Sequence, residues 1–520
     1  MSRCLNTWQR CSISSTPPQR TTMPTRSPLT SEQRAAATTT ANRAFIVAAP
    51  GSGKTTVAAE RFGVIRYDTP TDLRRILALS FTRSARGELA ARIRRRWGSG
   101  ALSWPHQALT LDTLHCEILA FLLRRQVISW MGDHTELTVL DTWRGQTGAR
   151  WMSKEMDYRR IAVLHGTTVG SHGVKITRPD YNIGAKRHFE EHLAAGRCTH
   201  TEVRQIIAAV LRRAELRMEV AKYLTATTKA IIVDEVFDAN ELDLELVRLA
   251  ASARISTTVI GDPWQALYDF RGARPELVPQ LVEHEGFESF PVSASFRFET
   301  PAMIGIAELA RAHRPIALDV TNDATECNVV LAHRWDNLWT GPDCILPLSF
   351  GRLDNQTDAA IALLLDRLVQ GHFGHAAIYA DEAAALLGLE PDIVRAEGAL
   401  LGAVLETLRP ATTQAATAAI TALRAVLRLL GSPRQLRRMP EAGEAVQLDR
   451  LLALARRMNQ PHVVAGMTVH QAKGREWPVV GLRLADVEVA RLTAGLKQER
   501  FDDRVLYVAL TRAAKKVVRC

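Results

Sequence analysis

Short apolar runs that end in small or polar residues recur in the first half of the chain. They occupy 45–47, 75–79, 229–233 and 257–260, and each is followed by a turn that contains Gly, Ser, Thr or Asp. Runs of this kind, separated by helical stretches, are typical of buried strands in a parallel α/β sheet. A second α/β unit is predicted after Ser295. Its strands are expected at 375–380, near 477–480 and at the end of the chain.

Two stretches lack this rhythm and are predicted to be helical insertions. Residues 116–219 lose the strand pattern altogether. Residues 386–460 are rich in Ala, Leu and Arg, and Leu423, Val426 and Leu427 fall on one helical face. The prediction is therefore an α/β protein with domain 1A at 29–115 and 220–291 and domain 2A at 292–385 and 461–520. We call the insertion at 116–219 1B and the insertion at 386–460 2B.

Composition limits the class of protein. With 46% hydrophobic residues in 520, most of the chain is expected to be globular, and no apolar run is long enough to span a membrane. The seven Cys form no Cys-x-x-Cys pair, which favours reduced thiols in a cytoplasmic protein over a disulfide framework or a zinc site. The net charge of +11 favours nucleic acid as a partner, although a basic enzyme without such a partner also has this charge.

The first 28 residues differ from the rest in being rich in Ser, Thr, Pro and Arg, with no acidic residue before Glu32. A disordered tail, a transit peptide and an over-long gene start with Met23 as the initiator all suit this composition. We favour a disordered tail or an over-long start.

The stretch from Ala48 to Thr56 has the pattern of a phosphate-binding loop. It follows the strand at 45–47, is rich in Gly, and ends in Gly-Lys-Thr at the start of a predicted helix. Backbone N–H groups and the helix N-terminus bind phosphate at such a turn. Lys54 is placed to reach the β- and γ-phosphates, and the Thr55 hydroxyl to ligate Mg²⁺. Ala48 stands where the full pattern has Gly.

Carboxylates and polar residues follow the other predicted strands. Asp234 and Glu235 end the strand at 229–233, which suits a metal partner and a base that deprotonates the attacking water. Gln265 follows the next strand and is placed to sense a γ-phosphate. Tyr268 and Phe270 come next and are candidates for stacking on unpaired bases, although core packing is the commoner role of such aromatics.

Four more residues lie at predicted carboxyl ends of strands, where ligands bind in open α/β sheets: Phe81, Thr82, Thr113 and His115. Near the N-terminus, Thr30 or Ser31 is expected to cap a short helix that carries Gln33. A Gln at this place, shortly before a phosphate loop, can read the edge of adenine through its amide.

Taken together, these motifs resemble those of superfamily 1 DNA helicases of the UvrD/Rep/PcrA type. The resemblance covers about 29–115, 229–300 and 463–518, in the order found in the family. It rests on APGSGKTT, SFTRSARGELAARI, DTLH, IIVDE, VIGDPWQALYDFRGA, SFR, TVHQAKGREWPVV and LYVALTRAAKK.

The resemblance implies two RecA-like domains with ATP and Mg²⁺ between them. The catalytic residues would be Glu235, Lys54, Arg297, Arg512 and Gln265, with Thr55 and Asp234 at the metal. ATP would contact Gln33, Ala49, Pro50, Gly51, Ser52, Gly53, Lys54, Thr55, Thr56, Phe296 and Glu476. DNA would contact Phe81, Thr82, Thr113, His115, Tyr268, Phe270, Thr468 and His470.

The implied activity is ATP-dependent 3′–5′ translocation on single-stranded DNA and unwinding of duplexes with a 3′ tail. This would serve repair, replication, recombination or phage defence, in a cytoplasmic, nucleoid-associated protein of bacterial or phage origin. Two features depart from the family. Phe237 replaces a Gln that couples ATP to DNA, and the interval from Arg297 to Thr468 leaves room only for a reduced 2B insertion. A DNA-stimulated translocase that does not unwind, and a degenerate module that only binds DNA or protein, therefore stay open as alternatives.

Overall fold

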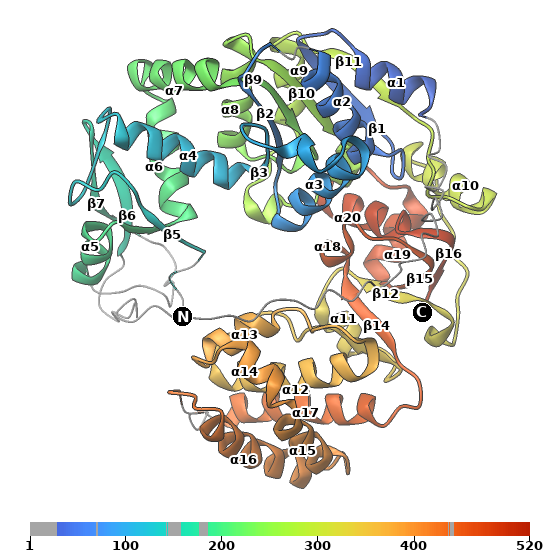
Figure 1. Cartoon of the computed structure of the whole chain (residues 1–520). Helices are drawn as coiled ribbons and strands as arrows, with labels where there is room; N and C mark the ends of the chain where they lie inside the picture. Colours follow the sequence, from blue (N-terminus) through green and yellow to red (C-terminus); the bar gives the residue numbers. More distant parts are fainter. Residues whose placement is uncertain are drawn as a thin grey trace, which may run out of the picture.

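The computed structural model describes residues 29–68, 71–141, 143, 158–175, 186–434, 436 and 441–520. The predicted disordered tail, residues 1–28, lies outside them. Two parallel sheets lie near the centre of the molecule, with an insertion beside the first sheet and a helical lobe below the second (Figure 1). Within the described residues, no helix is long and apolar enough to cross a lipid bilayer.

The first sheet has six strands in the order β11-β1-β10-β9-β2-β3, and all its pairs are parallel. Alternate residues of each strand point to opposite faces, so Phe45 and Ile46 lie in different hydrophobic clusters. Both faces are therefore buried, which explains the continuous apolar runs. The strands are β1 (Arg43–Ala48), β2 (Arg75–Ser80), β3 (Gln107–Thr110), β9 (Thr228–Val233), β10 (Ser256–Gly261) and β11 (Glu288–Val292).

Helices cover both faces of this sheet. One cluster joins it to α1 (Ser31–Thr38), α2 (Lys54–Asp68) and α3 (Arg83–Trp97). The other joins it to α4 (Leu111–Arg124), α7 (Ala214–Thr227), α8 (Glu241–Ser252) and α9 (Leu277–His284). Thr30 caps α1, as expected, and its hydroxyl accepts a hydrogen bond from the Gln33 N–H.

The second sheet has five parallel strands in the order β13-β14-β12-β15-β16. These are β12 (Val329–Ala332), β13 (Ile345–Pro347), β14 (Val464–Thr468), β15 (Trp477–Arg483) and β16 (Ala513–Arg519). The helices around them are α10 (Pro301–Arg311), α11 (Trp335–Trp339), α18 (Val469–Ala472), α19 (Asp486–Ala494) and α20 (Phe501–Leu510). The predicted fold class, α/β with two parallel sheets, is confirmed.

The strand predicted at 375–380 is wrong. These residues form a turn that leads into a helix, because their backbone groups bond elsewhere. The Ala377 N–H donates to the Asp366 carboxylate at 2.8 Å, and the Ile378 N–H donates to the Leu348 carbonyl at 2.9 Å. Tyr379 then adopts a left-handed conformation, with φ at +68°, just before the next helix begins.

The helical lobe begins at Gln356, well before the predicted start at 386. It comprises α12 (Gln356–Phe373), α13 (Ala380–Leu386), α14 (Pro391–Ala396), α15 (Gly398–Leu408), α16 (Thr413–Leu429) and α17 (Glu441–Met458). The expected apolar face of α16 is confirmed, since Leu423, Val426 and Leu427 are buried. These helices share one hydrophobic core with the second sheet.

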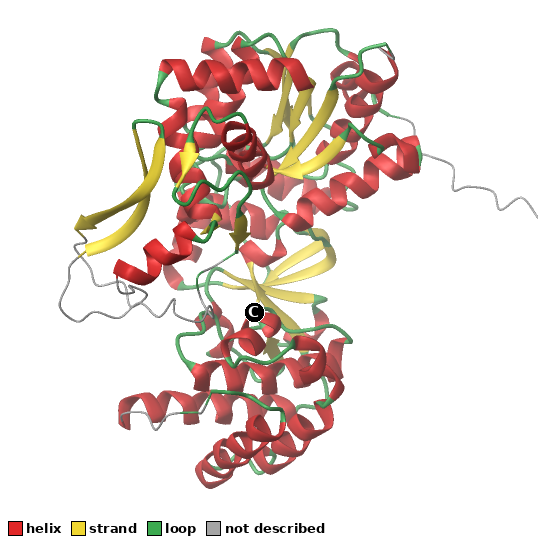
Figure 2. Cartoon of the chain, turned by 60° about the vertical axis from the view of Figure 1, so that its left-hand side comes forward, coloured by secondary structure: helices red, strands yellow, loops and turns green. Residues whose placement is uncertain are grey.

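The prediction that 116–219 is a helical insertion is wrong in part, because the region also contains strands. A long antiparallel hairpin of β6 (Tyr158–His165) and β7 (Thr168–Lys175) projects from this region, and β4 (Ser129–Trp130) pairs with β7 (Figure 2). A second small sheet joins β5 (Thr138–Leu140) to β8 (Arg197–Thr199). The helices of this insertion are α5 (Lys186–Ala194) and α6 (His200–Leu211), in addition to most of α4.

Candidate nucleotide and nucleic-acid site

A cavity of about 1240 Å³ lies where the carboxyl ends of the first sheet face the second unit. It brings together most residues that the sequence singled out. Those that line it are Gln33, Gly51, Gly53, Lys54, Thr55, Thr56, Phe81, Thr82, Asp234, Glu235, Gln265, Tyr268, Phe270, Phe296, Arg297, Thr468, His470, Glu476 and Arg512.

The phosphate loop is shaped by two left-handed glycines, with φ at +70° for Gly51 and +81° for Gly53. A Cβ atom at Gly51 would lie 2.4 Å from the Cβ of Arg297, so the second unit approaches the loop closely at this point. The Phe296 N–H donates to the Gly51 carbonyl at 2.9 Å, and the Ser295 hydroxyl donates to the Pro50 carbonyl at 2.7 Å. The loop is therefore held from the second unit as well as from its own strand.

Gln33 lies against this loop. Its Oε1 accepts a hydrogen bond from the Thr30 N–H at 3.1 Å, and its Nε2 donates to the Ser52 carbonyl at 2.8 Å. The side chain is buried, and these two bonds fix which amide atom is oxygen and which is nitrogen. Phe296 lines the same cavity and is 60% exposed, so its ring is free to contact a ligand.

Lys54, Asp234 and Glu235 form the charged floor of the cavity. Burial lowers the pKa of Lys54, while Glu235 opposes this shift. Burial, with the neighbouring charge of Glu235, raises the pKa of Asp234 to about 7, and a hydrogen bond from the Thr55 hydroxyl opposes this rise.

The pKa of Glu235 falls below its usual value. Burial alone would raise it, but four cations outweigh that effect: Lys473, Lys54, Arg512 and Arg297. Glu235 therefore stays ionised. Its φ of +60° is unusual for a residue with a side chain and marks local backbone strain.

Arg297 and Arg512 reach this floor from the second unit. Arg297 donates to Glu476 at 2.8 Å and to the Thr511 carbonyl at 2.8 Å. Arg512 is 1% exposed, and burial beside Arg297 lowers its pKa to about 9. Among the described residues, neither its Nη2 nor the Ser52 hydroxyl has a hydrogen-bond partner. Such buried groups are expected to donate hydrogen bonds to a ligand anion.

Lys473 was missed in the sequence, although it falls within TVHQAKGREW. Its ammonium group forms an ion pair with Asp238, donates to the Gln265 carbonyl at 2.8 Å and lies 3.8 Å from the Glu235 carboxylate. Arg92 was also missed. It lines the cavity and donates to the Thr56 hydroxyl at 2.8 Å. For both residues, the available signal was only their place within one of the quoted motifs.

An aromatic wall continues the cavity away from the phosphate loop. Tyr268 and Phe270 have ring centroids 5.8 Å apart, and Phe270 lies 5.4 Å from the His470 ring. Phe270 is 65% exposed, and the Arg271 guanidinium lies over both aromatic rings. Trp335 and Tyr379 line the same cavity and had no motif to signal them. This arrangement of exposed rings and arginine suits stacking on unpaired bases.

Two residues predicted on the DNA path lie elsewhere. His115 is 0% exposed, with its Nε2 3.7 Å from Asp243, and burial lowers its pKa to about 3. The prediction that His115 contacts DNA is wrong, because its neutral ring is fully enclosed by protein and cannot reach a ligand. Thr113 is exposed but lies outside the cavity wall, and its hydroxyl pairs with that of Thr110 at 2.8 Å.

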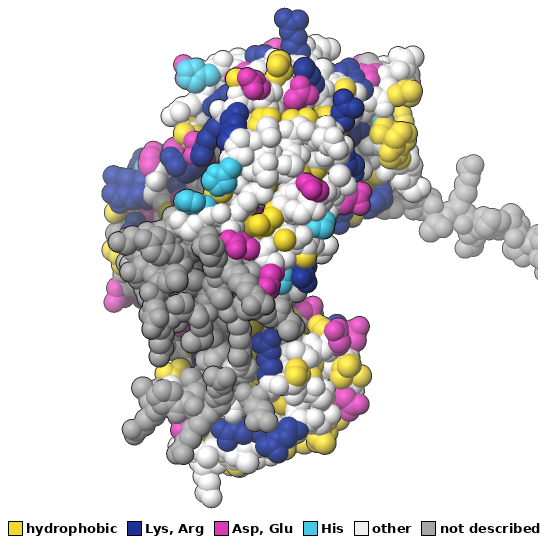
Figure 3. Space-filling model, turned by 90° about the vertical axis from the view of Figure 1, so that its left-hand side faces the viewer, with side chains coloured by type: hydrophobic (Ala, Val, Ile, Leu, Met, Phe, Trp, Pro, Cys, Tyr) yellow, Lys and Arg dark blue, Asp and Glu magenta, His cyan; other side chains and the backbone are white. Residues whose placement is uncertain are grey.

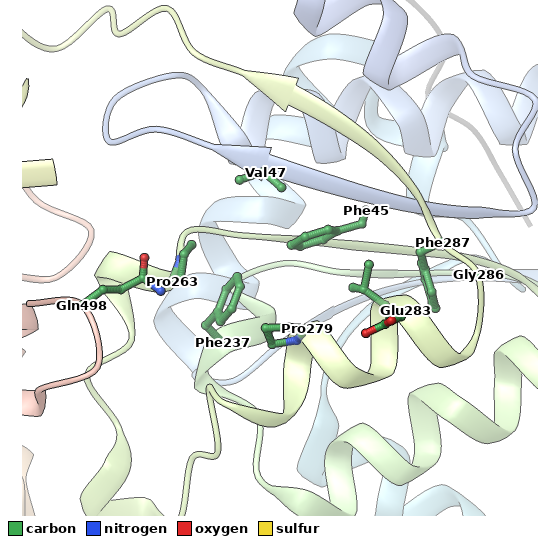
Figure 4. Close-up of a pocket in the computed structure, with 10 residues that line it drawn as sticks. Phe45, Val47, Phe237, Pro263, Pro279, Glu283, Gly286, Phe287 and Gln498 are labelled. Atoms are coloured by element: carbon green, nitrogen blue, oxygen red, sulfur yellow. The ribbon is translucent and has the colours of Figure 1, made fainter. Parts of the chain in front are cut away.

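Phe237 also faces away from this cavity. It is buried against Phe45, with ring centroids 6.2 Å apart, and it borders a separate apolar cavity of about 370 Å³ (Figure 4). Gly261 leaves room for it, since a Cβ there would lie 2.7 Å from the Phe237 ring. Phe237 is therefore a core residue. On the side of the nucleotide cavity, the ion pair of Lys473 with Asp238 makes a polar contact between the two units.

Charge on the outer surface is mixed. On the face shown in Figure 3, Lys and Arg side chains lie among Asp and Glu side chains, and the surface is hollowed between the upper and lower parts of the molecule. The net positive charge is therefore not gathered into one patch on this face.

Comparisons with known proteins identify the family of the chain. The family model described as the UvrD/REP helicase N-terminal domain matches residues 29–158 and 181–284, and the UvrD-like helicase C-terminal domain matches 464–518. Together these matches cover more than half of the chain.

Three curated relatives are similar over part of their length. ATP-dependent DNA helicase Rep of Escherichia coli K12 is 25% identical over 250 residues, which are 45% of this chain and 35% of Rep. ATP-dependent DNA helicase PcrA of Staphylococcus epidermidis RP62A is 25% identical over 258 residues, 47% of this chain and 34% of PcrA. A probable DNA helicase of Mycoplasma pneumoniae is 23% identical over 334 residues, 59% of this chain and 60% of that protein. The chain thus spans about a third of the length of Rep and PcrA. On the matches of both family models, it belongs to the UvrD/Rep family of helicases.

Proposed function

We propose that this protein hydrolyses ATP with Mg²⁺ in the cavity between its two sheets and uses the cycle to move 3′ to 5′ on single-stranded DNA, unwinding duplexes that carry a 3′ tail. One observation carries the proposal. A single cavity holds Lys54 and Glu235 of the first unit, Arg297 and Arg512 of the second, and the aromatic wall at Tyr268 and Phe270.

The residues present suit a triphosphate with its metal. The Thr55 hydroxyl and the Asp234 carboxylate are in hydrogen-bond contact, and both are oxygen ligands of the kind that Mg²⁺ prefers. When bound there, Mg²⁺ would neutralise charge on the phosphate oxygens.

The chain's own residues would then divide the work of hydrolysis. Glu235, ionised in the folded protein, would orient a water and accept its proton as the oxygen attacks the γ-phosphorus. The bond from that phosphorus to the bridging oxygen breaks, and ADP leaves. Lys54, Arg297 and Arg512 would stabilise the negative charge on the transferred group.

The coupling of hydrolysis to DNA would depend on the fact that the three cations belong to different units. Two of the three cations belong to the second unit, so they gather at the phosphate only when the two units are close. ATP would favour that closed state and hydrolysis would release it. Bases held on Tyr268 and Phe270 would be passed along as the units approach and separate.

Translocation without unwinding is the second candidate, and the size of the helical lobe favours it. The described lobe consists of α12 to α17 and shares a core with the second sheet, which leaves few elements free to grip a duplex.

The test is ATP hydrolysis with and without oligo(dT). Stimulation by the oligonucleotide is expected, and Lys54→Ala and Glu235→Gln should abolish turnover, while Lys222→Ala, on α7 outside the cavity, should not. ATP hydrolysis that is unaffected by DNA, or equal rates in all variants, would contradict the proposal.

A further inference from the structure

The turn that carries Gln265 is built into the second unit, although it belongs to the chain of the first. This turn is the 3₁₀ helix η3 (Pro263–Gln265), directly after β10. Trp264 is 4% exposed and lies in the hydrophobic core that joins the second sheet to the helical lobe. Its ring lies 4.9 Å from that of Tyr507 on α20.

An ion pair holds the same turn from the second unit. The Arg311 guanidinium, at the end of α10, donates to Asp262 Oδ2 at 2.6 Å, and Asp262 is 1% exposed. That same oxygen accepts a hydrogen bond from the Gln265 side-chain amide at 2.8 Å. The place of the Gln265 amide is therefore set by a carboxylate whose cation comes from the second unit.

Arg311 continues the connection to the arginine of the cavity. Its Nε donates to the Tyr507 hydroxyl at 2.7 Å, and its guanidinium lies over the Tyr507 ring. Tyr507 is fully buried in α20, and Arg512, two residues after the end of that helix, donates to the Val508 carbonyl at 3.2 Å. Contacts thus link Gln265 through Asp262 and Arg311 to Tyr507. Arg512 joins this set through α20, since it bonds to the carbonyl of Val508, the residue after Tyr507.

We propose that Arg311 is a positioning residue that makes Gln265 and Arg512 move as one body toward the γ-phosphate. This inference rests on the proposed ATP hydrolysis and adds to it. Gln265 would follow the second unit rather than the rest of the first sheet. The sensing amide and the buried arginine would then arrive together, and hydrolysis would begin only when both are in place.

The physical reason is the cost of separating these groups. Asp262 has almost no contact with water, so its charge depends on Arg311 and cannot be left unpaired. If the second unit moved away without the turn, both this pair and the Trp264 packing would be lost. The turn is therefore expected to stay with α10 and α20 when the cleft opens.

The experiment measures kcat and KM for ATP with saturating oligo(dT). Arg311→Met should lower kcat by roughly 10- to 100-fold with little change in KM, because a misplaced group slows the chemical step more than binding. Arg311→Lys, which keeps the charge toward Asp262, should recover part of the rate. Arg314→Met, an exposed arginine three residues on, is the matched control and should match wild type.

A double-mutant cycle gives the sharpest result. In a Gln265→Ala background, Arg311→Met should change kcat less than about 2-fold, since residues that act through one another are not additive. An additive loss would overturn the inference while leaving the proposed function intact. Wild-type protein that fails to hydrolyse ATP would instead overturn the proposed function.

Two further variants guard against a folding defect. Tyr507→Phe removes only the hydroxyl that links Arg311 to α20 and keeps the ring, so it should fold normally and lower kcat several-fold. Arg311→Met combined with Asp262→Asn leaves no unpaired charge. Melting curves that match wild type, together with unchanged kcat in both variants, would contradict the positioning role.

Discussion

At the scale of single residues, the burial of Phe237 means that a substitution there changes the stability of the protein. Phe237→Gln removes a ring that packs on Phe45 and places an amide in an apolar cavity, at a cost of about 3 kcal/mol in the free energy of unfolding. A lower melting temperature is expected, with DNA-stimulated ATP hydrolysis per folded molecule unchanged. Phe237→Leu is the control and should lose less stability. Stronger DNA stimulation at an unchanged melting temperature would instead give Phe237 a role in coupling.

His115 leads to a prediction about pH. Its pKa falls from 6.5 to about 3 on folding, so below pH 6.5 the unfolded chain binds a proton that the folded protein does not. Stability is then lost progressively as the pH falls from 6.5 toward 3, by about 2 kcal/mol at pH 5.

Comparison with His115→Leu isolates this effect. The raised pKa of Asp243, about 6, acts in the opposite direction, but that residue is present in both proteins. Melting temperatures measured between pH 7 and pH 5 should fall more for wild type than for the variant. Parallel curves would show that His115 does not titrate in this way.

At the scale of elements, Arg457 fixes α17 to the second sheet. It is 0% exposed, donates to the Ile345 carbonyl at 2.7 Å and to the Trp339 carbonyl at 2.9 Å, and lies over the Trp339 ring. Arg457→Met leaves these buried carbonyls without a donor, so a loss of about 3 kcal/mol is expected.

The neighbouring Arg456→Met is the matched control, because Arg456 is half exposed and only reaches Asp343 at 3.4 Å. Thermal melting and limited proteolysis between α17 and β14 are the measurements. Equal melting temperatures for the two variants would mean that Arg457 does not anchor the lobe.

The sequence predicted the strands whose burial produces a continuous run of apolar residues. Strands β1, β2, β9 and β10 are buried on both faces and read as continuous apolar runs, so they and the polar residues after them were found. Of the insertion strands, β4, β5 and β8 were missed because they are only two or three residues long. The eight-residue β6 and β7 were missed as well, and β7 contains Gly170 and Gly173, which are uncommon inside strands. The apolar segment at 375–380 had the composition of a strand, but its N–H groups bond to Asp366 and Leu348. Likewise, the burial of His115 and the bridging place of Lys473 depend on contacts with distant residues, which no local pattern encodes.

At the scale of the whole molecule, duplexes with different tails separate the two proposed activities. A helicase should unwind a duplex with a 3′ single-stranded tail and leave a 5′-tailed one intact, with Glu235→Gln inactive on both. A translocase without unwinding should instead displace streptavidin from a biotinylated single strand and leave both duplexes paired. Unwinding from the 5′ tail alone would reverse the proposed polarity.

The shared core of the second sheet and the helical lobe has a consequence for the size of any movement. Because α12 to α17 pack into the same hydrophobic cluster as β12, β14 and β15, we expect the lobe and the sheet to rotate as one rigid body. α15 and α16 lie at the far end of this rigid body, remote from the first sheet (Figure 1). A rotation that shifts Arg297 by the length of one hydrogen bond at the phosphate loop therefore sweeps these helices through a longer arc. The nucleotide cavity would thus set the position of a surface that no nucleotide touches.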